Sequence, residues 1–371
     1  MADQLPPVRP DLLDLPGYEP VQPLEDLARV AGLAPTDLLK LDANENPFGP
    51  LPVVPEMLAR LPGYERYPDP MQGRLRQAIA DYVEVPPDRI VAGAGSDELI
   101  DLCFRCLVSP GQSIISCPPT FGMYRFSAGL AGIPIVEVAR REDWRVHAEA
   151  VQAAITPATA LIVLASPNNP TGNALDRTEL AALLATGVPL LVDEAYAEFA
   201  GRSLVNELRR HPQLMLLRTF SKWAGLAGLR VGFGIFPEPV AGLLLKAKPP
   251  YNINIAGEAA VIASLQRRAV LDERVRKIVE TRAILMERLQ ALPWLEPYPS
   301  DANFVLCRVR DGDGRALKEA LAKHGVFVRY FDLPRLRDCV RLSIPRPDQV
   351  ATLIERLEVV GTDLYARRRP T

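Results

Sequence analysis

Residues Thr219–Gly234 read TFSKWAGLAGLRVGFG, a loop rich in small residues between two apolar runs that are typical of strands. Lys222 lies just after the first of these runs. A lysine in this position is partly desolvated, so its amine can lose its proton and act as a nucleophile. The chain has seven lysines, and the other six lie in polar, helix-like stretches. The segment therefore predicts that Lys222 is the covalent attachment point of a cofactor that carries a carbonyl group.

Length, charge and cysteine content limit the class of protein. The chain has 371 residues, a formal net charge of -2 and five cysteines. This length favours one large domain plus a smaller one, and the near-neutral charge predicts no nucleic-acid partner. We find no run of about 18 apolar residues and no apolar signal region near the N-terminus, so we expect no membrane association. An odd number of cysteines favours reduced thiols and a cytoplasmic protein.

Cys103 and Cys106 form a CxxC pair, which could suggest zinc or redox chemistry. A second pair at metal-binding spacing is missing from the sequence. Both cysteines fall on the apolar face of a predicted helix that reads DELIDLCFRCLV. We therefore expect these two side chains to pack in the core, and we predict no metal site.

From residue 89 onward, short apolar runs alternate with helical patterns, which is typical of βαβ units and a mainly parallel sheet. Asp176 and Glu179 predict a capping box at the start of one helix. The predicted strands of this region are Arg89–Ala92, Ser113–Cys117, Ile133–Val138, Leu161–Ala165, Leu190–Val192, Met215–Thr219 and Arg230–Ile235.

The C-terminal part predicts a second, smaller α/β unit. Gly257–Leu292 has apolar residues at helical spacing and is long enough to bridge two domains. The strands predicted after it are Ala302–Val309, Val326–Phe331 and Cys339–Ser343. We predict three parts: an N-terminal arm (residues 1–40) that packs on the small domain or on a partner subunit, a large domain (residues 41–255) and a small C-terminal domain (residues 256–371).

Two motifs predict a site for a phosphate and a flat ring. GAGSDE, residues 93–98, follows a strand and opens a helix, where free backbone N–H groups and the helix dipole bind anions. It lacks the lysine of a P-loop and the full dinucleotide fingerprint, so a nucleotide is not indicated. Phe121 lies at a turn after the second strand of this region, where it can cover a flat heterocycle or fill the core.

Further polar residues follow neighbouring strands. SPNNPTG, residues 166–172, can direct an amide donor into a cleft at the carboxyl edge of the sheet. Asp193 ends a buried strand, so it predicts either a partner with a protonated nitrogen or a helix N-cap. Tyr196 adds a phenol on the same side, and Ser221 with Arg230 can complete a phosphate site. The whole set describes a site for pyridoxal 5'-phosphate (PLP).

With DANENPFGP (residues 42–50), RYPDP (66–70) and CVRLSIP (339–345), these motifs make the chain similar to the fold type I PLP-dependent aminotransferases over nearly its whole length. Among them it is most similar to the histidinol-phosphate aminotransferases. The resemblance implies amino transfer between L-histidinol phosphate and 2-oxoglutarate, giving imidazole acetol phosphate and glutamate. An aromatic amino acid aminotransferase and a PLP-dependent threonine-phosphate decarboxylase remain alternatives. A ligand sensor or scaffold is a third, although intact Lys222 and Asp193 argue against it.

The resemblance implies roles at the ring of the cofactor. Lys222 would form the Schiff base with the cofactor and carry the proton, and Asp193 would pair with the ring nitrogen. Asn169 and Tyr196 would contact the ring oxygen. Phe121 would stack on the ring, at a position where family members often have tyrosine, so stacking would survive while a hydroxyl hydrogen bond would not.

The resemblance also implies the phosphate contacts and the assembly. The backbone N–H groups of Ser96 and Asp97 would bind the phosphate together with Ser221 and Arg230. Tyr67 of RYPDP would reach the phosphate from a neighbouring subunit, so we expect a homodimer with shared active sites.

Four residues are predicted to contact the substrate. Arg341 of CVRLSIP matches the family arginine that binds the acidic group of the substrate. Arg329 and Tyr18 match positions that help to hold the phosphate of histidinol phosphate and the second carboxylate of glutamate. For both arginines the alternative is a surface charge on a strand. Asn44 of DANENPFGP completes the predicted substrate-binding set.

Overall fold

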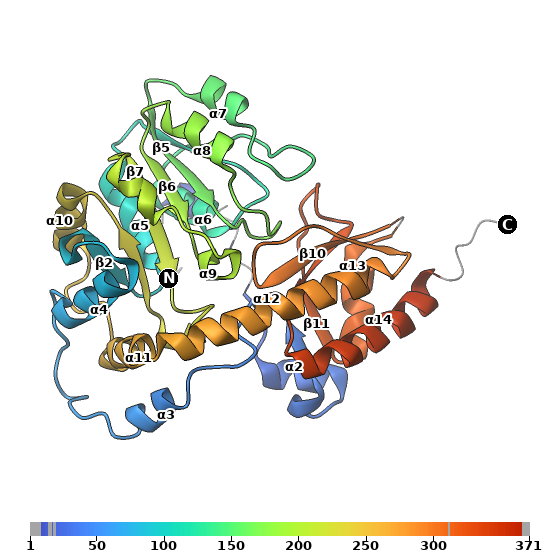
Figure 1. Ribbon diagram of the computed structural model, residues 1–371. Coiled ribbons are helices and arrows are strands. Elements are labelled where there is room, and N and C mark those ends of the chain that lie inside the picture. The colour runs from blue at the N-terminus through green and yellow to red at the C-terminus, as the bar shows by residue number, and fades with distance from the viewer. Residues whose placement is uncertain (1–8, 14–16, 18–19, 311, 366–371) are drawn as a thin grey trace, which may run out of the picture.

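The computed structural model describes residues 9–13, 17, 20–310 and 312–365. Within these residues the strands form two sheets (Figure 1). The larger sheet has the strand order β2-β8-β7-β6-β5-β3-β4. β8 runs antiparallel to both of its neighbours, whereas the other neighbouring strands pair in parallel. Its strands are β2 (Ile90–Gly93), β3 (Ser113–Ser116), β4 (Ile135–Glu137), β5 (Thr159–Ala165), β6 (Leu190–Asp193), β7 (Leu214–Thr219) and β8 (Gly232–Ile235).

The central strands of this sheet are buried on both faces, which explains why they appear in the sequence as continuous apolar runs. Side chains alternate between two clusters: Leu161 and Val163 of β5 face one, and Ile162 and Leu164 face the other. The helices beside the first cluster are α5 (Ser96–Leu107), α6 (Met123–Ala131) and α10 (Glu238–Ala247). Those beside the second are α4 (Gly73–Val83), α7 (Ala148–Ala154), α8 (Arg177–Leu184), α9 (Ala197–Ala200) and α11 (Ile255–Leu265).

The smaller sheet has the strand order β1-β11-β12-β10-β9 and is antiparallel except for the β1–β11 pair. Because β1 pairs with β11, a segment near the N-terminus completes a sheet built otherwise from the C-terminal part. Its strands are β1 (Leu39–Leu41), β9 (Leu295–Pro297), β10 (Phe304–Val309), β11 (Val326–Tyr330) and β12 (Cys339–Ser343). The division of the chain at residues 40 and 255 stays a prediction.

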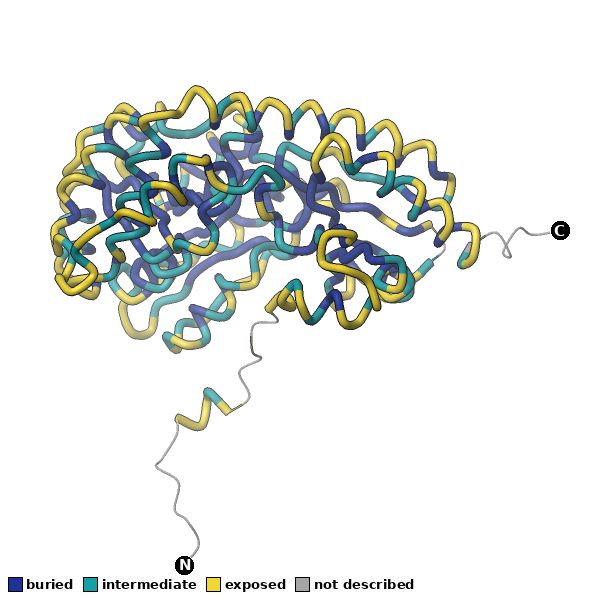
Figure 2. The backbone as a smooth tube through the Cα atoms, turned by 90° about the horizontal axis from the view of Figure 1, so that it is seen from below, coloured by how far each residue is buried: buried dark blue, intermediate teal, exposed yellow. Residues whose placement is uncertain are grey.

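The remaining helices frame these sheets. α12 (Arg268–Gln290) runs from the end of α11 along the molecule to the smaller sheet (Figure 1). Buried positions continue from one sheet to the other, while exposed positions follow the outer helices (Figure 2). The other helices are α1 (Pro10–Leu13), α2 (Leu24–Ala31), α3 (Val53–Leu58), α13 (Gly314–Lys323) and α14 (Val350–Tyr365), and short 3-10 turns lie at Pro35–Asp37, Pro87–Arg89, Val205–Arg209, Ala227–Leu229 and Pro347–Gln349.

Several local predictions are confirmed. Asp176 and Glu179 form the capping box at the start of α8, and Cys103 of α5 is fully buried in the core. The stretch Gly257–Leu292 is helical as predicted, and the chain forms it as two helices, α11 and α12, with a break at Arg267. Arg267 leaves the helical region with φ -120° and ψ 31°, although neither glycine nor proline marks the position.

Candidate active site

A cavity of about 680 Å³ lies at the carboxyl edge of the larger sheet, where this edge faces the smaller sheet. Parallel strands bring residues that follow different strands to the same edge, so distant motifs meet there. Twelve of the fourteen residues predicted for the site line this cavity. They are Asn44, Ser96, Asp97, Phe121, Asn169, Asp193, Tyr196, Ser221, Lys222, Arg230, Arg329 and Arg341.

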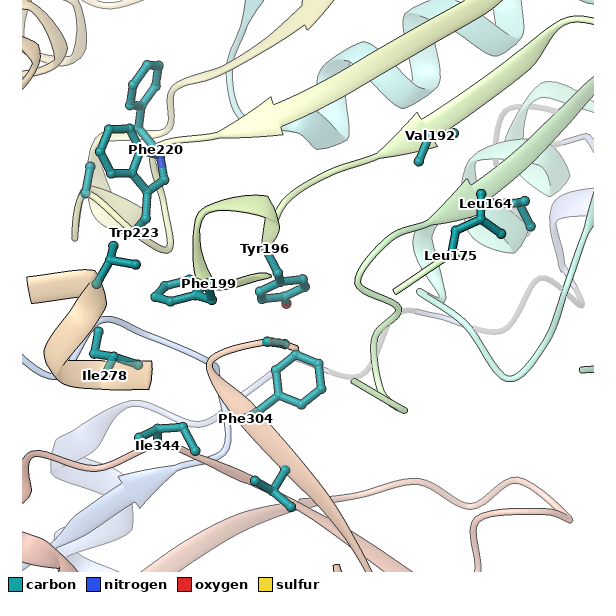
Figure 3. Close-up of a cluster of buried hydrophobic side chains, with 14 of the residues drawn as sticks. Leu164, Leu175, Val192, Tyr196, Phe199, Phe220, Trp223, Ile278, Phe304 and Ile344 are labelled. Atoms are coloured by element: carbon teal, nitrogen blue, oxygen red, sulfur yellow. The ribbon is translucent and has the colours of Figure 1, made fainter. Parts of the chain in front are cut away.

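Lys222 lies three residues beyond the end of β7 and is half-buried. Its neighbours Phe220 and Trp223 are fully buried, and their rings lie together on one side of the loop (Figure 3). Gly225, with φ +69°, lets the loop pass the carbonyl of Gly49, where a Cβ atom would collide. These contacts fix the backbone on both sides of the lysine.

The environment of the Lys222 amine favours its neutral form. Nζ donates a hydrogen bond to the backbone carbonyl of Ala43 at 3.0 Å. Burial, and after it the positive charge of Arg341, lowers the pKa of Lys222 to about 8. An amine with this pKa is neutral in about a tenth of molecules at pH 7, so part of the population can act as a nucleophile or as a base.

Asp193 is the last residue of β6 and is buried. Its Oδ1 accepts a hydrogen bond from the backbone N–H of Ala195 at 3.0 Å, and its Oδ2 accepts one from the hydroxyl of Tyr124 at 3.0 Å. Burial raises the pKa of Asp193 to about 7, while these two donors act in the opposite direction. The alternative role as a helix N-cap is not observed, because Tyr196 occupies the N-cap position of α9.

The beginning of α5 and the end of the Lys222 loop form a site suited to an anion. Ser96 is the first residue of α5 and lines the cavity, so the free N–H groups at the N-terminus of this helix lie beside the cavity. Arg230 has φ +55° and lies outside β8, so the predicted strand Arg230–Ile235 begins two residues too early. Its guanidinium pairs with Asp97 at 3.1 Å. A Cβ atom at position 95 would collide with this guanidinium, so Gly95 leaves the room that it needs.

Arg341 of β12 joins both sides of the cavity. One guanidinium nitrogen donates to Oδ1 of Asn169, and the other donates to the backbone carbonyl of Asp42 at 2.6 Å. With its oxygen engaged, Asn169 presents its amide nitrogen as the donor. The adjacent Asn168 has a different role, because its buried amide donates to Pro119 O at 3.0 Å and holds the loop.

Asn44 and Tyr196 connect the two sheets. The Asn44 side chain donates to the Tyr196 hydroxyl at 3.0 Å, and its backbone N–H donates to Oγ of Ser343 in β12 at 2.9 Å. The Asn44 side chain is only 1% exposed, and its predicted substrate contact stays a prediction. The Tyr196 ring meets Phe304 of β10 edge to face, with centroids 5.1 Å apart (Figure 3).

Of the predicted site residues that the structure describes, Tyr67 alone does not line the cavity. Tyr67 is 81% exposed and stacks on Tyr251 with ring centroids 4.4 Å apart. Its predicted contact comes from a neighbouring subunit and stays a prediction. Tyr18 lies outside the described residues.

The sequence reasoning missed several groups at this site. Tyr124, the partner of Asp193, lies three residues after Phe121 but has the sequence pattern of an ordinary core aromatic. The carbonyl of Ala43 has no sequence signal, because every residue carries one. Arg125, Phe331 and Asp332 also line the cavity.

Among the described residues, no three His, Cys, Asp or Glu side chains are grouped to hold a metal ion. In the same part of the chain, every helix is too short or too polar to cross a membrane.

The fold and the cavity define an α/β protein with a lysine of lowered pKa at the carboxyl edge of its larger sheet, and comparison with known proteins gives the family. Residues 36–357 match the family model described as aminotransferase class I and II. The chain therefore belongs to the class I and II aminotransferases.

Individual relatives show which members of this family the chain is similar to. The chain is 48% identical over 366 residues to the histidinol-phosphate aminotransferase of Roseiflexus castenholzii, an alignment that covers 95% of this chain and 98% of the relative. The chloroplastic histidinol-phosphate aminotransferase of Nicotiana plumbaginifolia is 42% identical, with 95% and 86% covered. The structure of histidinol-phosphate aminotransferase from Sinorhizobium meliloti in complex with PLP has a TM-score of 0.86 at 27% identity, covering 97% and 99%. The predicted resemblance and the fold type are confirmed.

Proposed function

We propose that the protein is a PLP-dependent aminotransferase that moves the amino group of L-histidinol phosphate to 2-oxoglutarate, giving imidazole acetol phosphate and glutamate. The observation that carries the proposal is the position of Lys222, whose amine has a pKa lowered to about 8 and shares one cavity with Asp193 and Arg230. The names of relatives that are 42% and 48% identical over 95% of the chain support the choice of substrate.

The residues around the cavity fit PLP. The first turn of α5, Ser221 and Arg230 provide N–H, hydroxyl and guanidinium donors for a phosphate. At the other end, Asp193 would pair with the ring nitrogen, and Phe121 would cover the ring face. When bound, PLP supplies an electron sink for the negative charge that develops at the substrate Cα.

Lys222 would be both the attachment point and the proton carrier. Its Nζ would take the proton from the substrate Cα, because burial and Arg341 keep part of the amine neutral. Asn169 and Tyr196 would hold the ring oxygen. The Tyr196 hydroxyl is positioned by the Asn44 amide at 3.0 Å, so this phenol would keep one orientation during the reaction.

Both proposed substrates are anions, and the smaller sheet provides cations for them. Arg329 of β11 and Arg341 of β12 line the cavity opposite Lys222. Arg341 would bind the acidic group that the substrates present, and Arg329 would help to hold the phosphate of histidinol phosphate or the second carboxylate of glutamate. Tyr18 and Asn44 complete the proposed substrate contacts.

A homodimer with shared sites is part of the proposal. Tyr64, Tyr67, Met71 and Tyr251 are large apolar side chains that are 45% to 81% exposed, and such exposed groups mark interfaces. Tyr67 would reach the cofactor phosphate of the partner subunit. Mixing inactive Lys222→Ala and Tyr67→Ala subunits should restore activity in mixed dimers, and no recovery would argue against shared sites.

The cysteines support a cytoplasmic location for the protein. All five have free thiols, which is typical of proteins in a reducing compartment.

The substrate is tested by steady-state kinetics with L-histidinol phosphate, phenylalanine or threonine phosphate as the amino donor and 2-oxoglutarate as the acceptor. We expect the highest kcat/KM for L-histidinol phosphate, because Arg329 and Arg341 line the cavity and would attract its phosphate. A strong preference for phenylalanine would make the protein an aromatic amino acid aminotransferase. Release of carbon dioxide from threonine phosphate without any need for a keto acid would make it a decarboxylase.

A further inference from the structure

Tyr124 is a buried tyrosine that the proposed reaction leaves without a role. It is the second residue of α6 and its side chain is fully buried. Its hydroxyl donates to Oδ2 of Asp193 at 3.0 Å. Its ring meets Phe121 edge to face, with centroids 5.7 Å apart and planes at 88°. Tyr124 therefore contacts two residues that line the cavity, Phe121 and Asp193, from behind.

We propose that Tyr124 is the positioning residue of Asp193: its hydroxyl, together with the Ala195 N–H, fixes the carboxylate plane and favours the charged carboxylate. The inference rests on the proposed function, in which Asp193 pairs with the ring nitrogen of PLP. The two donors occupy different oxygens of the carboxylate. Because each oxygen has two acceptor positions, the carboxylate can still accept a hydrogen bond from the cavity side.

The charges around Asp193 show why such a donor matters. Burial, together with the negative charges of Asp97 and Glu194, raises the pKa of Asp193 to about 7. The hydrogen bonds from Tyr124 and the Ala195 N–H lower it. Without the tyrosine hydroxyl, the charged carboxylate would therefore be less favoured near neutral pH.

The surroundings of Tyr124 keep its hydroxyl protonated, so that it donates the hydrogen bond to Asp193. Burial and the nearby Asp193 raise the pKa of the Tyr124 phenol, so this hydroxyl stays protonated. Tyr196 acts in the same direction, and buried Arg140 opposes it. Arg140 is itself held by hydrogen bonds to Cys117 O and Trp144 O, both at 3.0 Å. The phenol thus remains a donor over the pH range in which Asp193 titrates.

Tyr82 offers a matched control. Its hydroxyl donates to Oε1 of Glu198 at 2.9 Å, in a part-buried network that includes Arg218. The chemistry is the same as at Tyr124, a phenol donating to a carboxylate. Glu198, however, does not line the cavity. Tyr82→Phe therefore measures the general cost of removing a phenol from a tyrosine–carboxylate pair.

The experiment measures the dissociation constant of PLP as a function of pH for the wild-type protein, Tyr124→Phe and Tyr82→Phe. In the wild type, affinity should rise with pH as the Asp193 carboxyl loses its proton. A charged hydrogen bond of this kind is worth roughly tenfold or more, so in Tyr124→Phe this rise should move upward by about one pH unit, with about fivefold weaker binding at pH 7. Tyr82→Phe should keep the wild-type profile while its thermal stability falls.

A double-mutant cycle tests whether Tyr124 acts through Asp193. In the Asp193→Asn background the titrating carboxylate is gone, so adding Tyr124→Phe should change PLP affinity by less than about twofold. The inference is overturned if Tyr124→Phe and Tyr82→Phe have the same pH profile, or if the full effect persists in Asp193→Asn. If the wild-type protein binds no PLP at any pH, the proposed function fails as well, which separates that outcome from failure of the inference alone.

Discussion

The two sides of the cavity are built differently. On the side of the larger sheet, Asp193 ends one buried strand and Lys222 follows another, so a strand in the same stretch of sequence places each side chain. On the side of the smaller sheet, Arg341 reaches across to Asn169 and to the carbonyl of Asp42, which is 299 residues away in the chain. The first side would hold the cofactor and the second the substrate. Local sequence thus places the side chains of the cofactor half, which the Ala43 carbonyl and Tyr124 then contact from distant parts of the chain. The substrate half depends on long-range packing throughout.

The largest effect is expected at the lysine of the cofactor half. Lys222→Ala should lower turnover of histidinol phosphate with 2-oxoglutarate by at least about 10³-fold, because attachment point and proton carrier are lost together. The protein loaded with PLP should also lose its pH-dependent yellow absorbance. Steady-state rates and absorbance spectra over pH check both effects.

Lys277→Ala is the control for this change. Lys277 is exposed on α12 and pairs with Glu273 at 2.8 Å, so its loss should leave the rate and the spectrum unchanged. Retention of half the wild-type rate by Lys222→Ala would exclude the proposed role of Lys222.

The substrate half should respond differently from the cofactor half. Arg341→Lys keeps the charge but cannot contact Asn169 and the Asp42 carbonyl together, because an ammonium lacks the planar fork of a guanidinium. We expect kcat/KM to fall roughly 10-fold to 100-fold for both substrates, with PLP affinity nearly unchanged. Steady-state kinetics and PLP titration on the same preparation measure the two quantities.

An arginine on the neighbouring strand serves as the control for Arg341→Lys. Arg308 of β10 is exposed and pairs with Asp338 at 2.6 Å, so Arg308→Lys should preserve kcat/KM. If Arg341→Lys weakens PLP binding as much as it lowers kcat/KM, Arg341 belongs to the cofactor half, and the distinction between the two sides is lost.

The difference between local sequence patterns and long-range packing also explains which strands the sequence predicts. The apolar runs of β5, β6 and β7 were predicted because strands buried on both faces have a strong local pattern. β1 and β9 were missed, because each has three residues with a polar one in the middle, and only pairing with β11 and β10 makes them strands. Their structure is determined by partners far away in the chain.

The site follows the same rule. Strand-end motifs predicted the residues that line the cavity from the larger sheet, because a charge after a buried strand needs a partner. The Tyr124 hydroxyl and the Ala43 carbonyl were missed. A buried tyrosine has the sequence pattern of any core aromatic, and a backbone carbonyl has no pattern at all. Both contacts become visible only when the chain is folded.

The smallest effect concerns the stability of the protein without PLP. Burial raises the pKa of Asp193 from 3.8 to about 7. Between these two values the folded state binds more protons than the unfolded state, so the Asp193 contribution to stability falls as pH rises through this window and remains unfavourable above it. Asp193→Asn removes this penalty, so at pH 8 the variant should be more stable by about 1–2 kcal/mol.

The gain is smaller than the pKa shift alone would give, because the amide NH₂ of Asn cannot accept the hydrogen bond that Tyr124 or the Ala195 N–H donates to the carboxylate. Thermal unfolding of the cofactor-free protein at about pH 4 and about pH 8 checks the sign, because the advantage of the variant should appear only at the higher pH. Asp272→Asn changes a half-buried carboxylate on α12 that pairs with Arg268 at 3.3 Å, and it should give no such pH-dependent gain. Equal unfolding temperatures for wild type and Asp193→Asn at both pH values would mean that the buried carboxylate costs nothing. The cofactor half would then carry no stability cost from its buried charge.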